Sequence, residues 1–489
     1  MFFRMGICGI LDKTAIYFGQ KGSRVQMKKR LSILWILLLA ALTLCGCSND
    51  NHGLSKGNPT TISVWHYYNG HTASRFDELV TEFNNTVGRE NGVIITAQSM
   101  SSTTDLENAL WNSASEKIGS AKMPNIFQCY PDTALSLKSK ITLVDFNEYI
   151  TEDEKLTYVR QFLDSGYIGQ DNAWEIFPVA KSTEVLMLNK TDWDKFARDT
   201  GADIYSLQTW EGLAMTAQEY YEWSEGKAFF GRDSFANYPI LGSSQLGHEL
   251  FNDSSYPITL DFDQSVMKKV WNHFYVPYVN GYYSQVGKSR CDDVRVGEII
   301  ALVCSSSNAA YFPNEVVLPD GTAYPIECMV LPLPNFKDTA PYAVLQGAGM
   351  AVTKSTEAEE YASVLFLKWF TESEQNLKFS ASSGYMPVSL EAVKTDVISA
   401  YLEEHSANAV IRDAIMTSLT QMEKYIMYAP TGFVGGSQAK DVLERTMPAL
   451  AIADRSEIEN GAPPDEYLSE EHFKEWYADT LSELKQYCN

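Results

Sequence analysis

The sequence predicts an α/β fold organised in two domains, and two observations support this. Segments with the alternation typical of β-strands are interleaved along the chain with segments of helical period, a pattern that indicates βαβ units and mainly parallel sheets. After residue 46 the chain has about 440 residues, more than a single hydrophobic core usually organises. No repeat with a period of about 20 to 50 residues occurs, which excludes solenoids and propellers.

The N-terminal stretch has the features of a signal peptide. Lys28, Lys29 and Arg30 form a basic region, and residues 31–44 form an uncharged, mostly apolar run. This run is shorter than the roughly 20 apolar residues of a membrane-spanning helix, so we expect it to be removed after export. Residues 1–26 are an unusually long extension, and Met27 is an alternative start. We therefore interpret residues 1–46 as a signal peptide with an N-terminal extension.

The stretch Leu44-Cys45-Gly46-Cys47 resembles a bacterial lipobox. That resemblance implies that Cys47 receives a diacylglycerol and becomes the new N-terminus, while Cys45 leaves with the signal peptide. The alternative is an ordinary signal peptide with an incidental cysteine. A metal or redox pair is disfavoured, because one residue between the cysteines does not match C-x-x-C and no His or Cys cluster follows. We expect residues 47–60, polar and rich in glycine, to be a lipidated tether.

The mature chain is strongly acidic. Residues 1–46 hold seven of the 39 basic residues and one of the 62 acidic ones, which leaves 32 against 61 and a net charge of about −29. Such a charge keeps a protein soluble and disfavours binding to nucleic acid or to anionic lipid headgroups, so membrane attachment would come from the lipid alone. Five cysteines remain after Cys47, an odd number with apolar neighbours, and we expect buried free thiols rather than a disulfide framework.

The first half of the mature chain begins with a strand, a helix, a strand, a helix and a strand. In the first helix Phe76, Leu79, Val80 and Phe83 have the spacing of one buried face. The expected ranges are 61–68, 72–88, 92–99, 103–118 and 123–130.

The pattern continues in the second half. A helix follows in residues 209–226, where Thr209 can cap the first turn and Glu211 adds negative charge to it. The remaining strands are expected within 174–189, 297–312, 324–335 and 342–354, followed by helical sequence in 357–384 and through most of the last hundred residues.

Several stretches together resemble the extracellular solute-binding proteins of ABC importers, in particular family 1, which includes the maltose- and glycerol-phosphate-binding proteins. The strongest similarity runs from Leu331 to Val388, through "LPLPNF", "QGAGMAVTKST" and "EYASVLFLKWFTESEQNLKFSASSGYMPV". Further similar stretches are "ISVWHYYNG", "FPVAKSTEVLMLNK" and "SLQTWEGLAMTAQEYYEW". Together these stretches extend over about 400 residues in the order that the family shows.

The resemblance implies a two-lobed periplasmic-binding-protein-like fold of type II, with a ligand cleft between the lobes. Each lobe would be a mainly parallel sheet flanked by helices, with 61–170 plus 329–386 forming lobe 1 and 171–328 plus 387–489 forming lobe 2. The chain would cross between lobes near 169–173, near 326–330 and just after Pro387. A cleft at these positions agrees with the rule that α/β sheets bind ligands outside the carboxyl ends of their strands.

Candidate ligand contacts are the side chains that follow the expected strands, together with those in the similar stretches. Aromatic rings stack on the apolar face of a sugar, and hydroxyls or carboxylates bond its OH groups, so this mixture indicates a carbohydrate. Any single aromatic residue is more often part of a core, and we assign Trp210, Trp271, Trp369 and Phe370 to packing. The candidates are Trp65, His66, Tyr67, Tyr68, Tyr130, Asp132, Ser182, Thr183, Ser305, Ser306, Ser307, Gln346, Gly347, Tyr385 and Tyr428.

The expected function is that of a substrate-binding lipoprotein of an ABC importer, a monomer that captures a carbohydrate outside the cell and delivers it to a membrane permease. A glycerol-phosphate or glycerophosphodiester ligand is the alternative within the family, although the late loop "YAPTGFVGG" lacks the arginine expected for it. An exported glycoside hydrolase and a surface adhesin or sensor are less favoured. No P-loop, dinucleotide fingerprint, H-E-x-x-H or G-x-S-x-G motif is complete, so neither an enzyme nor a cofactor or metal is expected.

Overall fold

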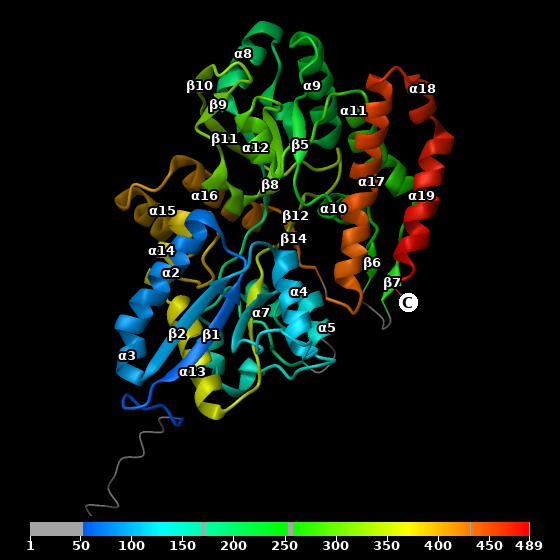
Figure 1. The fold of residues 1–489 in the computed structure, drawn as a ribbon. Helices are drawn as coiled ribbons and strands as arrows, with labels where there is room; N and C mark the ends of the chain where they lie inside the picture. The colour runs from blue at the N-terminus through cyan, green and yellow to red at the C-terminus, as the bar shows by residue number, and fades with distance from the viewer. Residues whose placement is uncertain (1–51, 169–171, 253–257, 431, 489) are drawn as a thin grey trace, which may run out of the picture. The chain divides into compact units, whose positions relative to one another are not determined.

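The computed structural model describes residues 52–168, 172–252, 258–430 and 432–488 (Figure 1). The expected signal peptide, the lipidation site at Cys47 and most of the tether lie outside these residues. Leu54–Asn489 forms one compact unit. Among its described residues, none of the helices combines the length and the apolar character that crossing a membrane requires.

The first sheet contains the three strands expected at the start of the mature chain and one strand from much later. Its order is β13-β3-β1-β2, with β1 at Thr60–His66, β2 at Val93–Ser99, β3 at Ile126–Cys129 and β13 at Gly349–Val352. Strands β2 and β3 both pair with β1 in parallel, and β13 pairs with β3 antiparallel. The sheet is therefore mainly parallel, as predicted.

Helices pack on both faces of this first lobe. Helix α2 (Gly70–Asn85) buries Phe76, Leu79, Val80 and Phe83, the face predicted from their spacing. Helix α4 (Thr103–Ala114) begins at Ser102, whose hydroxyl accepts a bond from the Asp105 amide. Helix α13 (Glu357–Phe370) begins with a capping box between Thr356 and Glu359. Trp369 and Phe370 are buried on α13, as expected.

The second sheet has the order β11-β4-β8-β5, with β4 at Glu184–Asn189, β5 at Phe230–Arg232, β8 at Ala301–Ser305 and β11 at Cys328–Pro332. Here β4 pairs antiparallel with both β8 and β11, and only β5 and β8 are parallel. The expectation of a mainly parallel sheet is thus wrong for this lobe. Period-two alternation locates a strand, but its direction depends on which distant segment it pairs with.

A helical layer completes the second lobe. Thr209 caps α9 (Trp210–Trp223) by accepting from the Gly212 amide at 3.0 Å, as predicted. Helices α11 (Gln264–Val279), α17 (Gly436–Glu459) and α19 (Glu470–Leu484) pack against one another (Figure 1). Trp210 and Trp271 are buried in this lobe, which agrees with their assignment to packing.

The remaining elements are short or connect these layers. Their bounds are α3 Val87–Asn91, α5 Pro131–Leu137, η1 Phe146–Glu148, α6 Glu152–Lys155, α7 Arg160–Asp164, α8 Lys190–Thr200, η2 Ile204–Gln208, α10 Asn237–Gln245, β6 Phe251–Asn252, β7 Thr259–Leu260, α12 Arg290–Arg295, η3 Ser306–Tyr311, β9 Glu315–Val317, β10 Ala323–Pro325, β12 Tyr342–Val344, α14 Ser373–Ser383, α15 Thr395–Glu404, α16 Ala409–Lys424, β14 Ile426–Tyr428 and α18 Pro464–Tyr467.

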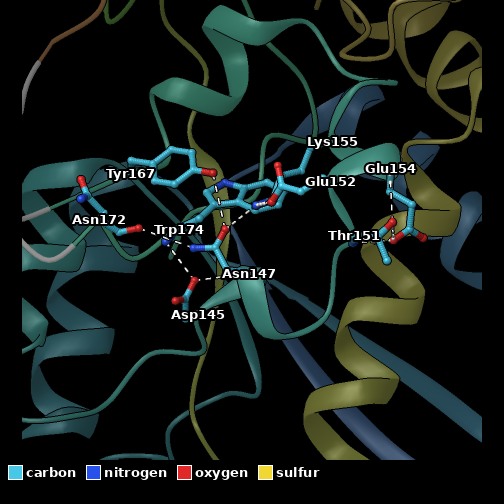
Figure 2. A network of polar contacts seen from close by, with 9 residues as sticks. All are labelled: Asp145, Asn147, Thr151, Glu152, Glu154, Lys155, Tyr167, Asn172 and Trp174. Carbon is cyan, nitrogen blue, oxygen red and sulfur yellow. Dashed lines mark hydrogen bonds and ion pairs between the residues drawn. The ribbon is translucent and has the colours of Figure 1, made fainter.

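The chain enters the second lobe later than the similarity suggested. Figure 2 shows the segment around Trp174 tied to the first lobe, where Asp145 Oδ1 accepts from the amides of Asn147 and Trp174, both at 3.0 Å. Trp174 is fully buried and stacks on Phe177, whose backbone bridges to Met350. The first crossing therefore follows Phe177 and does not lie near 169–173.

The second crossing also lies later than expected. Strand β11 belongs to the second sheet, and the chain rejoins the first sheet only at β13. Residues 328–332, at or beyond the expected boundary of 326–330, thus pair within the second lobe. The crossing segments meet through backbone bridges between Lys181 and Met386 and between Ser182 and Gln346. The residue numbers of a crossing differ between members of a family wherever an insertion changes the length of a loop. The position of the boundary between the lobes is therefore given by strand pairing.

Candidate functional site

Three candidate tyrosines come together at the strand ends of the first lobe. Tyr67 follows β1, Tyr130 follows β3 and Tyr385 follows α14, and the hydroxyls of Tyr67 and Tyr130 lie 3.4 Å apart. Burial, and then the neighbouring Tyr130, raise the pKa of both Tyr67 and Tyr385, so the hydroxyls stay protonated. The Ser307 side chain, from η3 after β8 of the second sheet, lies close enough to Tyr385 to act against the rise in the pKa of its hydroxyl. The four side chains offer neutral hydroxyls beside aromatic faces.

The two residues before Tyr67 and Tyr68 lie in the core of the first lobe. His66 is 1% exposed, packs against Tyr68 and Phe76, and neither ring nitrogen has a hydrogen-bond partner among the described residues. Burial lowers its pKa to about 4, so the ring is neutral at physiological pH. Trp65 packs on the opposite face of the sheet. Tyr68 is buried against Phe76, Phe379 and Tyr385, so it packs between the core of the first lobe and the tyrosine cluster.

The serine loop after β8 joins three segments of the chain. Ser306 is fully buried, its amide donates to the Thr183 carbonyl at 2.8 Å and its hydroxyl donates to the Gly384 carbonyl at 3.1 Å. The hydroxyls of Ser305 and Ser307 lie 2.9 Å apart. Ser306 thus holds η3 against two crossing segments.

Two further candidates pair crossing segments through their backbones. Ser182 and Gln346 exchange two backbone hydrogen bonds, at 3.0 and 2.8 Å. Gly347 has a φ of +94°, and a Cβ at this position would lie 2.6 Å from the Ala180 carbonyl oxygen. Thr183 is fully buried, and the backbone of Tyr428 in β14 accepts from the Leu345 amide at 2.8 Å.

Asp132 is engaged with a distant segment. Its Oδ2 lies 2.5 Å from Lys440 Nζ, and its Oδ1 accepts from the Phe433 amide at 2.9 Å. Both carboxylate oxygens are therefore used by groups around the start of α17.

A pocket of about 440 Å³ lies where the two lobes meet, and it contains residues absent from the sequence-based candidates. Asp233 follows β5 directly, and burial raises the pKa of its carboxyl to about 6. The Asn308 side chain donates to Asp233 Oδ2 at 3.2 Å. Applying the strand-end rule to "FFGRD" would have found Asp233. The lining is Asn69 from the first lobe with Asp233, Lys288, Ser289, Cys291, Asp292, Arg295, Asn308 and Tyr311 from the second.

Tyr311 and Arg295 also line a neighbouring pocket of about 510 Å³. The Tyr311 hydroxyl donates to the backbone carbonyl of Asn69 at 2.9 Å and lies 3.0 Å from its side-chain oxygen. This contact brings the start of α2 against the end of η3, and so helps to define one edge of the interlobe surface.

The five cysteines after Cys47 are all free, as expected, and Cys328 alone among them is only half-buried. Within the described ranges there is no group of three or more His, Cys, Asp or Glu side chains that could hold a metal ion.

Comparison with solved structures shows a common fold. The chain is similar to a cyclic alpha-maltosyl-1,6-maltose binding protein from Arthrobacter globiformis, at 20% identity and a TM-score of 0.63, covering 88% of this chain and 100% of that one. It is similar to UgpB from Mycobacterium tuberculosis, solved with glycerophosphocholine, at 17% identity and a TM-score of 0.65, covering 88% and 98%. An ABC substrate-binding protein from Listeria monocytogenes, solved with cycloalternan, gives 16% identity and a TM-score of 0.64, covering 87% and 99%.

A search of curated protein sequences found no significant match. A family profile described as bacterial extracellular solute-binding protein does match, over residues 78–404, which contain Tyr130, Tyr385 and the serine loop, while Tyr67 and Asn69 precede the matched range. The match extends over more than half of the chain and agrees with the two-lobed α/β fold. This chain therefore belongs to the bacterial extracellular solute-binding proteins.

Proposed function

We propose that this protein is the substrate-binding lipoprotein of an ABC importer and that its solute is a carbohydrate or a related polyol. The family implies an exported protein that binds a small molecule and delivers it to a permease. The observation that supports a carbohydrate is the cluster of Tyr67, Tyr130 and Tyr385 facing Ser307 of the other lobe. Aromatic faces and neutral hydroxyls suit the apolar face and the OH groups of a sugar.

Two cations of the protein are paired with its own carboxylates. The Lys440 ammonium pairs with Asp132, and the buried Arg232 guanidinium pairs with Glu184 at 2.8 Å. These pairs leave the two cations committed to protein carboxylates rather than to a ligand anion. Asp233 and Asn308 in the interlobe pocket can bond hydroxyl groups.

A glycerophosphodiester is the second candidate. Lys288 and Arg295 line the interlobe pocket, where they could contact a phosphate. The similarity to the protein solved with glycerophosphocholine is of the same degree as the similarity to the two proteins named for or solved with oligosaccharides.

The proposal also includes how the protein is attached to the membrane and how it handles its solute. Cys47 carries the lipid anchor that holds the mature chain at the outer face of the cytoplasmic membrane, and the protein works as a monomer. The two lobes close around the solute, and the closed form is presented to the permease. Binding leaves the solute chemically intact, so the protein is a receptor and not a hydrolase.

The proposal is tested by thermal unfolding of the mature protein with maltose, maltotriose, mannotriose, cycloalternan, ribitol and glycerophosphocholine. A solute present at about 100 times its Kd should add about 2.7 kcal/mol of stability and raise the Tm. Tyr385→Ala should weaken that effect, because it removes a ring and a hydroxyl from the cluster, while exposed Tyr205→Ala should leave it unchanged.

The outcomes separate the candidates. A Tm rise with a saccharide or with ribitol, and recovery of the intact solute by mass spectrometry, supports the carbohydrate proposal. A rise with glycerophosphocholine alone supports the second candidate. Cleavage of an oligosaccharide would instead indicate a hydrolase. If Tyr385→Ala bound the solute with wild-type affinity, the tyrosine cluster would not be part of the binding site.

A further inference from the structure

The carboxylate of Asp132 is held entirely by a segment more than three hundred residues away. Asp132 lies in the first turn of α5, is 2% exposed, and receives the Lys440 ammonium on one oxygen and the Phe433 amide on the other. The fit is close, because a Cβ added to Gly436 would lie 2.2 Å from Asp132 Oδ1. The two segments are therefore in direct contact.

The two segments belong to different lobes. Helix α5 follows β3 of the first sheet. Lys440 is in the second turn of α17, which packs against α11 and α19 in the second lobe (Figure 1). The ion pair and the Phe433 hydrogen bond thus join the two lobes directly.

A second carboxylate makes Lys440 more important to this contact. Glu107 in α4 accepts from the Thr133 hydroxyl at 2.6 Å, and the charges of Asp132 and Lys440 both act on it. The Lys440 ammonium pairs with Asp132, and its charge also acts against the rise that burial causes in the pKa of Glu107. Without the ammonium, the buried Asp132 carboxylate would lose its counter-ion near the half-buried Glu107, which is a costly arrangement.

We propose that Lys440 and Asp132 are positioning residues that hold the two lobes together before any solute binds. We call this ion pair, with the Phe433 hydrogen bond, the interlobe clasp. When only a fraction of the molecules is competent to bind, the apparent Kd rises by the inverse of that fraction. The clasp raises the closed fraction and so tightens binding without touching the ligand. It is independent of the identity of the solute, and it gives Asp132 a role other than ligand contact.

The test uses the ligand-free mature protein. Lys440→Met should enlarge the radius of gyration in small-angle X-ray scattering, because the closed population falls. Asp132→Ala should do the same and also speed hydrogen exchange at the Phe433 amide, by roughly tenfold if one hydrogen bond to a charged group is lost. Asp132→Asn retains an acceptor for that amide and should affect scattering more than exchange. Lys440→Arg keeps a cation beside Asp132 and should give the same scattering curve as the wild type.

The matched control is Lys138→Met. Lys138 and Lys440 are 27% and 28% exposed, and Lys138 pairs at 2.6 Å with Glu175, another buried carboxylate, but within the first lobe. This variant should lower the Tm without changing the scattering. The proposal is overturned if Lys440→Met scatters as the wild type does, or if Lys138→Met expands the protein equally. If Asp132→Ala does not fold, Lys440→Met decides, since it removes only the half-exposed partner.

Discussion

At the residue scale, the same local motif places neighbouring side chains in different surroundings. The stretch "WHYY" was expected to face the ligand as a whole. In the structure Trp65 and His66 point into opposite sides of the core, Tyr68 supports the cluster and Tyr67 reaches Tyr130. Strand alternation explains the first two residues, because successive side chains of β1 point to opposite faces.

His66 should make the protein sensitive to acid. Its pKa is lowered to about 4 from 6.5, so between these values the unfolded chain binds a proton that the folded protein does not. Stability is therefore lost as the pH falls from about 6.5 toward 4, by up to about 3 kcal/mol. Urea unfolding of His66→Leu at pH 7 and pH 4.5 should show a weaker pH dependence than the wild type. Exposed His71→Gln serves as the control, and an unchanged dependence in His66→Leu would contradict this reasoning.

At the element scale, the crossing segments depend on backbone contacts more than on side chains. Ser182 and Gln346 exchange backbone bonds, Lys181 and Met386 pair in the same way, and Gly347 packs against Ala180. Several candidates selected as ligand contacts therefore hold the crossings. Ser182 and Gln346 were selected because their side chains are polar, but it is their backbone hydrogen bonds that fix their positions.

Gly347→Ala should destabilise the protein. A non-glycine residue at positive φ costs about 1–3 kcal/mol, and the added Cβ would also approach the Ala180 carbonyl. Gly201→Ala is the control, because Gly201 has a φ of +80° but no atom within 4 Å of an added Cβ, so it loses only the conformational part. Urea unfolding should place Gly347→Ala clearly below Gly201→Ala, and equal losses would show that the close approach is relieved without cost.

At the scale of the whole molecule, the net charge and the expected anchor decide how the protein meets a membrane. A mature charge of about −29 disfavours anionic lipid surfaces, so attachment rests on the diacylglycerol proposed at Cys47. Cys47→Ala, expressed in a bacterium that processes lipoproteins, should release the protein into the soluble fraction. Intact-mass measurement of the membrane fraction should find the wild-type chain starting at a lipid-modified Cys47, and an unmodified chain there would disprove the anchor.

The sequence by itself determined the strands of the first sheet, the buried face of α2, the Thr209 cap, the buried tryptophans and the family resemblance. These features depend on periodicity and on residue types close together in the chain. Only the tertiary structure decided the strand directions of the second sheet and the positions of the crossings. It alone paired Asp132 with Lys440, 308 residues away, because a buried carboxylate takes its partner from whatever segment the fold brings beside it.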